Sequence, residues 1–185
     1  RKRLMSVALV DLERLGRTNE CAGTRVADRI LEALAHLLKE QVSRDSGYEG
    51  VFRYDGHQFL LFFGDAEHAA ATTHVERIRQ TIEATLFEYQ GKQYSLTVRA
   101  GVTAVRPEDG KEDLLQRLAE LASSAKEVGG NCTCTDEGVQ VNVVPPPALS
   151  LPPRTITIQR PLAPHGDAPP GRESSSLLQN DLPGQ

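Results

Sequence analysis

The sequence predicts an α/β (α+β) domain in which helices pack on a sheet with a central antiparallel hairpin. Three observations lead to this fold class. Short apolar runs are typical of buried strands, three segments carry apolar residues at helical spacing, and an Asp-Gly dipeptide separates two strand-like runs. The chain of 185 residues leaves room for one such domain and a tail.

A strand followed by a helix opens the predicted domain. Residues 4–11 form a short apolar run that ends in the carboxylate of Asp11, which indicates a buried strand. Residues 25–42 carry apolar side chains at helical spacing. Asp28 is expected in the first turn of this helix, where the helix dipole favours a negative charge.

A hairpin and a second helix are expected next. Residues 51–54 and 58–63 have the composition of strands, and Asp55-Gly56 between them is a strong signal for a hairpin turn. Residues 66–86 place apolar side chains on one helical face, so we expect a single helix over this range.

A strand, a helix and a final strand complete the predicted domain. Residues 93–105 alternate in polarity and indicate a long strand interrupted by Gly101. Residues 112–127 have helical spacing, and residues 139–143 look like a last strand. The predicted order is therefore strand, helix, hairpin, helix, strand, helix, strand.

The composition changes near residue 144, where we place the end of the domain (1–144). Ten of the 11 prolines lie in residues 145–185, and proline removes a backbone donor. Large apolar residues are few there, so we expect a disordered Pro-rich tail. Residues 154–158 alternate like a strand and are a candidate for docking. The tail as a whole suits either a linker or a ligand for aromatic grooves.

The overall composition excludes several classes of protein. A formal net charge of -4 and a pI near 5.8 argue against a nucleic-acid binder with a broad basic surface. No apolar run approaches the roughly 20 residues that span a bilayer. Three cysteines do not make a disulfide framework, which favours a reducing, cytoplasmic compartment. The chain does not begin with Met, so we expect it to be a piece of a longer protein.

Several short motifs follow one another in a fixed order along the chain. Residues 53–59 read Arg-Tyr-Asp-Gly-His-Gln-Phe, residues 99–103 read Arg-Ala-Gly-Val-Thr, and residues 125–131 read Ala-Lys-Glu-Val-Gly-Gly-Asn. These segments resemble the GGDEF motifs Arg-Tyr-Gly-Gly-(Asp/Glu)-Glu-Phe, Ser-Ile-Gly-Val-Ala and Ala-Lys-x-x-Gly-Arg-Asn. The resemblance covers residues 4–143. It implies a fold similar to nucleotide cyclases and an activity that makes cyclic di-GMP from two GTP molecules.

The resemblance also implies site residues. Asp11 matches a metal ligand, Asn19 and Asp28 match two guanine contacts, and Lys126 matches a phosphate contact. GTP is then the expected ligand and Mg²⁺ the expected metal. Ordinary structural roles are open for the same residues: Asp11 as a turn cap, Asn19 and Asp28 as helix caps, and Lys126 as a cation opposite the helix dipole.

The centre of the hairpin motif departs from the family. His57 and Gln58 stand where the family has acidic residues, Asp55 replaces a glycine, and Gly56 is retained. Magnesium prefers carboxylate oxygens, and two anionic charges are missing from its expected site. Gly130 also replaces an arginine that holds phosphate in the family.

These departures lead to three hypotheses. The first is a GGDEF-type domain without cyclase activity, which acts as a regulatory module that binds GTP or another protein. Its partner would be a second copy, in a homodimer, or another signalling domain. The second is an active or weakly active cyclase in which Glu13 supplies the missing charge, since it shares a strand face with Asp11. The third is a purely structural or dimerisation domain.

Overall fold

The computed structural model describes residues 4–13, 24–42, 48–137, 140–146 and 151–159. Its helices are α2 (Thr24–Val42), α3 (His68–Glu83) and α4 (Lys111–Glu127). Its strands are β1 (Met5–Leu12), β2 (Tyr48–Asp55), β3 (Gln58–Gly64), β4 (Thr85–Tyr89), β5 (Lys92–Ser95), β6 (Val98–Ala104), β7 (Thr133–Glu137), β8 (Gln140–Val143) and β9 (Arg154–Ile158). The predicted fold class, with its hairpin and three helices, is confirmed within the described residues.

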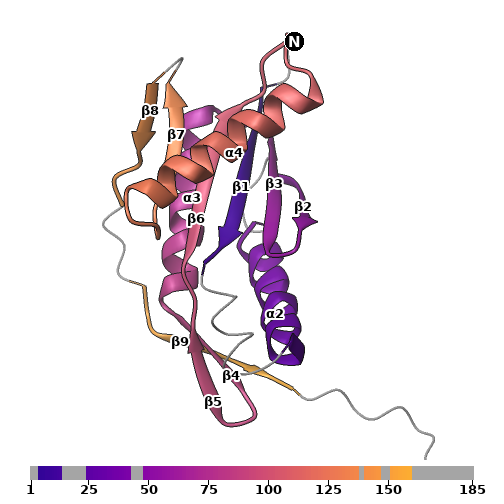
Figure 1. Ribbon diagram of the computed structural model, residues 1–185, viewed down its shortest axis with the longest axis vertical. Coiled ribbons are helices and arrows are strands. Elements are labelled where there is room, and N and C mark those ends of the chain that lie inside the picture. Colours follow the sequence, from indigo (N-terminus) through magenta and orange to yellow (C-terminus); the bar gives the residue numbers. More distant parts are fainter. Residues whose placement is uncertain (1–3, 14–23, 43–47, 138–139, 147–150, 160–185) are drawn as a thin grey trace, which may run out of the picture.

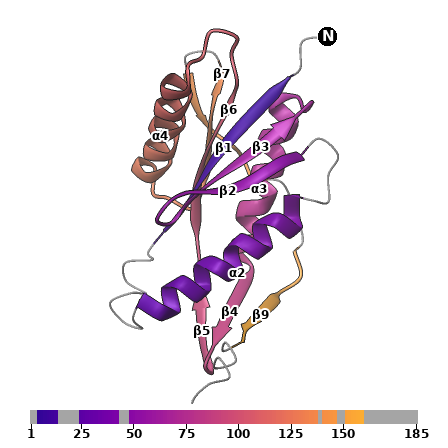
Figure 2. The ribbon, with the colours of Figure 1, turned by 90° about the vertical axis from the view of Figure 1, so that its right-hand side faces the viewer.

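A six-stranded sheet forms the centre of the domain, in the order β2-β3-β1-β6-β7-β8. Strand β1 pairs antiparallel with both β3 and β6, and β6 pairs parallel with β7. Helices α2 and α3 lie on one face of the sheet, and α4 crosses the other (Figures 1 and 2). None of the described helices is long and apolar enough to cross a membrane.

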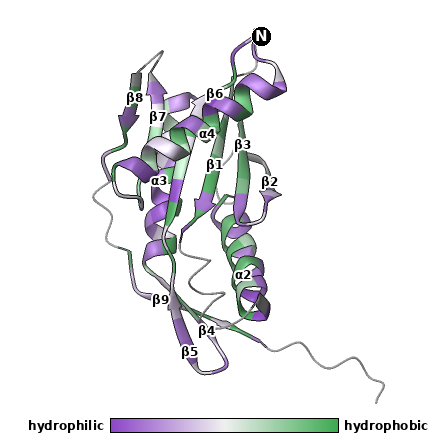
Figure 3. Ribbon diagram, viewed as in Figure 1, coloured by the Kyte–Doolittle hydropathy of each residue, from purple (hydrophilic) through white to green (hydrophobic). Residues whose placement is uncertain are grey.

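Strand β1 contributes to the core on both faces of the sheet. Ala8 and Val10 pack in the cluster beneath α2 and α3, whereas Val7 and Leu9 pack beneath α4. Because successive strand residues point to opposite faces, a strand covered on both sides has consecutive apolar residues, as Val7–Val10 do here. Figure 3 shows β1 coloured as hydrophobic over most of its length, with a hydrophilic part near its end.

The predicted helix over 66–86 is too long. Helix α3 ends at Glu83, and β4 begins at Thr85. Leu86 fits the helical spacing, but it is 36% exposed on the strand, while the side chain of Phe87 is fully buried. Alternating β-branched and aromatic residues determine the structure here, and they override the apparent helical period.

The predicted strand over 93–105 is two strands rather than one. Strand β5 ends at Ser95 and pairs with β4, whereas β6 begins at Val98 and belongs to the six-stranded sheet. Gly101 lies within β6 and does not interrupt it. The predicted last strand over 139–143 corresponds to β8, and β7 before it was not predicted.

The absence of a side chain at Gly101 allows α4 to approach the sheet closely. A Cβ atom there would lie 2.7 Å from Leu121 Cβ and 2.9 Å from the Leu118 carbonyl oxygen. We therefore expect Gly101→Val to lower the free energy of unfolding by about 3 kcal/mol, the upper part of the overpacking range. Urea denaturation measures this, with Gln93→Val on exposed β5 as the control. An effect no larger than that of the control would contradict the close packing.

A second sheet, in the order β5-β4-β9, lies at the end of the molecule opposite the N-terminus (Figure 1). Strand β9 lies within residues 145–185, so part of the expected tail is an ordered strand. The strand-like alternation of residues 154–158 is confirmed. The domain boundary at residue 144 stays a prediction.

Candidate active site

Asp11 lies between two polar neighbours at the end of β1. The strand register places Gln58 of β3 on one side of Asp11 and Arg99 of β6 on the other. Residues that face each other across paired strands point to the same side of the sheet. The antiparallel pairing therefore gathers three side chains from distant parts of the sequence at one point. The Asp11 carboxylate is buried there, with 3% of the side chain exposed.

The contacts of Asp11 surround its carboxylate with nitrogen atoms. Its Oδ2 accepts hydrogen bonds from Arg99 Nη2 at 2.6 Å, Arg99 Nε at 3.1 Å and Gln58 Nε2 at 3.2 Å. The half-exposed His57 places Nε2 at 3.1 Å from Oδ1, within ion-pair distance but without hydrogen-bond geometry. Arg99 is thus the counter-ion of a buried carboxylate.

The donor set at Asp11 does not fit Mg²⁺. That ion requires octahedral coordination by oxygen atoms, commonly from carboxylates and water. Here Asp11 Oδ2 is already bound by Arg99, and His57 and Gln58 add no anionic oxygen. The part of the chain that the structure describes contains no group of three or more His, Cys, Asp or Glu residues that could hold a metal.

Glu13 binds a different part of the chain. Its Oε2 accepts a hydrogen bond from the backbone N–H of Asn131 at 2.9 Å. Gly130 lies against the same carboxylate with φ of +76°, and a Cβ atom at residue 130 would collide with Glu13. Glu13 therefore fixes the turn after α4, and this hydrogen bond does not favour the hypothesis that it supplies charge beside Asp11.

A buried ionic network supports that turn from α3. Glu76 and Arg79 are 2% and 6% exposed, and Arg79 Nε donates to Glu76 Oε1 at 2.8 Å. Arg79 Nη1 also donates to Glu83 Oε2 at 2.8 Å and to Asn131 Oδ1 at 2.7 Å. Burial raises the pKa of Glu83, but hydrogen bonds from Arg79 and Asn131 outweigh burial and hold that pKa below its usual value.

Asn131 and Thr133 complete the network through hydrogen bonds to the two glutamates of α3. The side-chain nitrogen of Asn131 donates to Glu83 Oε1 at 2.8 Å, and the backbone of Asn131 has a φ of +48° in the left-handed region. Thr133 Oγ1 donates to the second oxygen of Glu76 at 2.7 Å. This turn is the segment that resembles the family's phosphate-binding run, so α3 and β7 together determine its shape.

The other predicted site residues lie apart from Asp11. Lys126 is exposed in the last turn of α4, where a cation meets the helix dipole favourably. Asp28 is exposed on α2, but the expectation that it lies in the first turn is wrong, because α2 begins at Thr24. No hydrogen bond or ion pair joins Asp28 to Lys126 among the described residues. Asn19 lies outside them.

The hairpin turn has the predicted position. Asp55 ends β2, Gly56 follows with φ of +27°, and Gln58 begins β3. Arg53 Nε and Nη2 both donate to the Gly56 carbonyl oxygen, at 2.9 and 2.6 Å. The exposed turn thus presents His57 beside the buried carboxylate of Asp11.

Comparison with known proteins identifies the fold and the family. The family model for the diguanylate cyclase GGDEF domain matches residues 1–132. The chain belongs to the GGDEF family. The resemblance seen in the sequence is therefore confirmed. The β2–β3 hairpin contains the segment that corresponds to the GGDEF motif.

Curated GGDEF relatives are similar over most of the described domain. Diguanylate cyclase A of Treponema denticola is 24% identical over 132 residues, and diguanylate cyclase DgcZ of Escherichia coli is 29% identical over 137 residues. These alignments cover 71% and 74% of this chain but only 35% and 45% of the relatives. The chain thus spans less than half of either relative.

A solved GGDEF structure has the same fold. The GGDEF domain of DgcB from Caulobacter crescentus, in complex with c-di-GMP, superposes with a TM-score of 0.67 at 17% identity. The superposition covers 74% of this chain and 80% of that domain.

Arg99 is the site residue that sequence reasoning missed. The GGDEF run Ser-Ile-Gly-Val-Ala, which residues 99–103 resemble, has a serine at that position. A basic residue within a mostly apolar stretch, residues 98–104, was the available signal. Only the register of β1 with β6 shows that this cation lies opposite Asp11.

Proposed function

We propose that this GGDEF domain does not join two GTP molecules and instead acts in cyclic di-GMP signalling as a regulatory module that binds GTP or a partner protein. The single observation that carries the proposal is the Asp11 carboxylate bound by Arg99, with His57 and Gln58 in place of acidic residues. This function belongs in the cytoplasm, where GTP is available.

The reaction that joins two GTP molecules requires a metal ion, which is why the contacts of Asp11 argue against cyclase activity. Joining two nucleoside triphosphates requires a metal ion that coordinates phosphate oxygens and stabilises the charge that develops in the transition state. Arg99 neutralises Asp11, but a guanidinium held by a carboxylate cannot coordinate an attacking oxygen. The buried Asp11 carboxylate therefore has a counter-ion in Arg99, but this counter-ion cannot supply the chemistry of a metal ion.

Nucleotide recognition does not depend on the same residues. Asn19 and Asp28 are the proposed guanine contacts, and Lys126 is the proposed phosphate contact. The GGDEF relationship supports these roles, and both Asp28 and Lys126 are exposed. We also propose that the domain works beside a second copy or another signalling domain.

The proposal predicts GTP binding without turnover. Incubation of the chain with GTP and Mg²⁺ should give no cyclic di-GMP above a protein-free control, measured by mass spectrometry. Isothermal titration should give a Kd for GTP that changes less than about twofold when Mg²⁺ is removed, because no metal site is required. Asp28→Ala should weaken this binding by about 10-fold, the usual effect of losing one charged hydrogen bond.

Two outcomes separate the alternatives. Formation of cyclic di-GMP that Asp11→Ala abolishes would overturn the proposal in favour of an active cyclase. Absence of binding at millimolar GTP would remove the nucleotide part and leave partner-protein binding as the function. Glu120→Gln on the exposed face of α4 is the matched control for loss of one surface carboxylate.

A further inference from the structure

Strand β9 is an addition to the part of the chain that matches the GGDEF family model. The match ends at residue 132, whereas β9 covers Arg154–Ile158. It pairs in parallel with β4 over five register positions, from Thr85↔Arg154 to Tyr89↔Ile158. Figure 2 shows β9 beside β4 at the end of the molecule that α2 also reaches. An edge of the second sheet is therefore covered by a strand from much later in the sequence.

The side chains of β9 match the surface that receives them. Ile156 and Ile158 are partly buried against the main hydrophobic core, in register with Phe87 and Tyr89 of β4. Arg154 Nη2 lies 2.7 Å from Glu40 Oε2 on α2. The edge of β4 and the exposed side of α2 thus form an acceptor for a strand that places a basic residue two positions before an isoleucine. We call this surface the strand acceptor.

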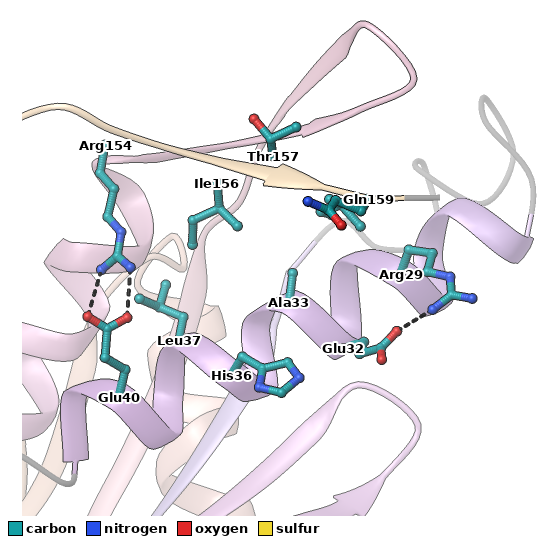
Figure 4. Close-up of a pocket in the computed structure, with 11 residues that line it drawn as sticks. Arg29, Glu32, Ala33, His36, Leu37, Glu40, Arg154, Ile156, Thr157 and Gln159 are labelled. Atoms are coloured by element: carbon teal, nitrogen blue, oxygen red, sulfur yellow. Dashed lines mark hydrogen bonds and ion pairs between the residues drawn. The ribbon is translucent and has the colours of Figure 1, made fainter. Parts of the chain in front are cut away.

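The contact between β9 and α2 is incomplete. A groove of about 320 Å³ remains between them, bordered by Arg29, His36 and Glu40 of α2 and by Ile156 and Gln159 (Figure 4). The Arg154–Glu40 pair is itself 37% and 40% exposed, and exposed pairs contribute little stability. Strand β9 is therefore held mainly by its pairing with one strand and by two half-buried side chains.

The segment that leads into β9 is rich in proline. Five of the ten residues between β8 and β9 are proline, at residues 145–147 and 152–153. Proline narrows the conformations that are open to the backbone, so the four described prolines at 145–146 and 152–153 limit how the chain can turn after β8 and before β9. The same property favours the delivery of β9 to another molecule.

We propose that the strand acceptor binds β9 of a second copy of this chain, so that two copies exchange this strand. The contacts would be the same within one molecule and between two, and the protein concentration would decide between them. The partner is thus defined by the contacts that β9 makes with β4 and α2. The proposal is independent of nucleotide binding.

Disulfide capture between two different single-cysteine additions tests the exchange. Glu88 and Thr157 are register partners in β4 and β9. Chains carrying Glu88→Cys are mixed with chains carrying Thr157→Cys, refolded together near millimolar concentration and oxidised. A disulfide that joins the two kinds of chain is expected, and its yield should fall at least 10-fold after 100-fold dilution before oxidation.

The controls make the test decisive. Each variant oxidised alone reports the contribution of the native cysteines, and a chain with both substitutions must close within itself at low concentration to verify the register. Adding Ile156→Asp to the Thr157→Cys chain should abolish the mixed disulfide, since that change removes the docking side chain. If the double variant closes but no mixed disulfide forms, the exchange is overturned.

Discussion

Replacing Arg79 by methionine is expected to lower the free energy of unfolding by about 3–5 kcal/mol, the range for breaking a buried ion pair from one side. Glu76 would remain almost fully buried with one of its two oxygens unpaired, and Asn131 and Glu83 would also lose a donor. Urea denaturation followed by circular dichroism measures the loss.

Two further variants show whether the loss comes from charge. Arg79→Met combined with Glu76→Gln removes the unpaired carboxylate and should recover at least about half of the lost stability. Arg29→Met breaks an exposed pair with Glu32 that has the same helical spacing, and it should change stability by less than about 0.5 kcal/mol. If the Arg79 and Arg29 variants lose equal stability, the network does not support the turn.

Replacing Arg99 by methionine is expected to lower the free energy of unfolding by about 3 kcal/mol, because Asp11 would become a buried carboxylate without its counter-ion. The expected value lies at the lower end of the range because the Arg99 side chain is 20% exposed. Thermal and urea unfolding measure the change. Arg53→Met in the exposed hairpin is the matched control, since Arg53 bonds only a carbonyl oxygen among the contacts described for it.

The Arg99 variant also distinguishes an internal ion pair from an unused metal site. Arg99→Met with Asp11→Asn should recover stability, because the pair is removed from both sides. Adding Mg²⁺ to the single variant should not recover it, since His57 and Gln58 supply no carboxylate. A stabilisation of the single variant by millimolar Mg²⁺ would show that Arg99 alone had excluded the metal.

The sequence predicts those elements whose hydrophobic period is long and unambiguous. The runs at β1, α2 and α4 gave correct strands and helices because burial on defined faces controls both periods. Strand β4 was missed because Leu86 fits a helical period, and β7 because its residues Thr133–Glu137 are mostly polar. Besides a neighbour in a hairpin, each of the two strands pairs with a strand that is distant in sequence, β4 with β9 and β7 with β6, and local spacing does not encode that second partner.

In the candidate site, too, local sequence motifs predicted some features, whereas contacts that depend on strand pairing were not predicted. The motif at residues 53–59 was sufficient to place the hairpin turn and to show that two acidic residues are missing. The partnership of Asp11 with Arg99 depends on the register between β1 and β6, which local spacing does not encode. Glu13 and Asn131 form a contact for the same reason, after the chain has returned to the same end of the sheet.

The pairing of β9 with β4 has a consequence for the order of folding. All the other described strands, in both sheets, precede β9 in the sequence. Strand β9 is therefore the last of them to leave the ribosome. Until then the edge of β4 has unpaired backbone groups beside apolar side chains, and such edges promote aggregation. Nascent chains interrupted before residue 154 should therefore be the species that most need a chaperone.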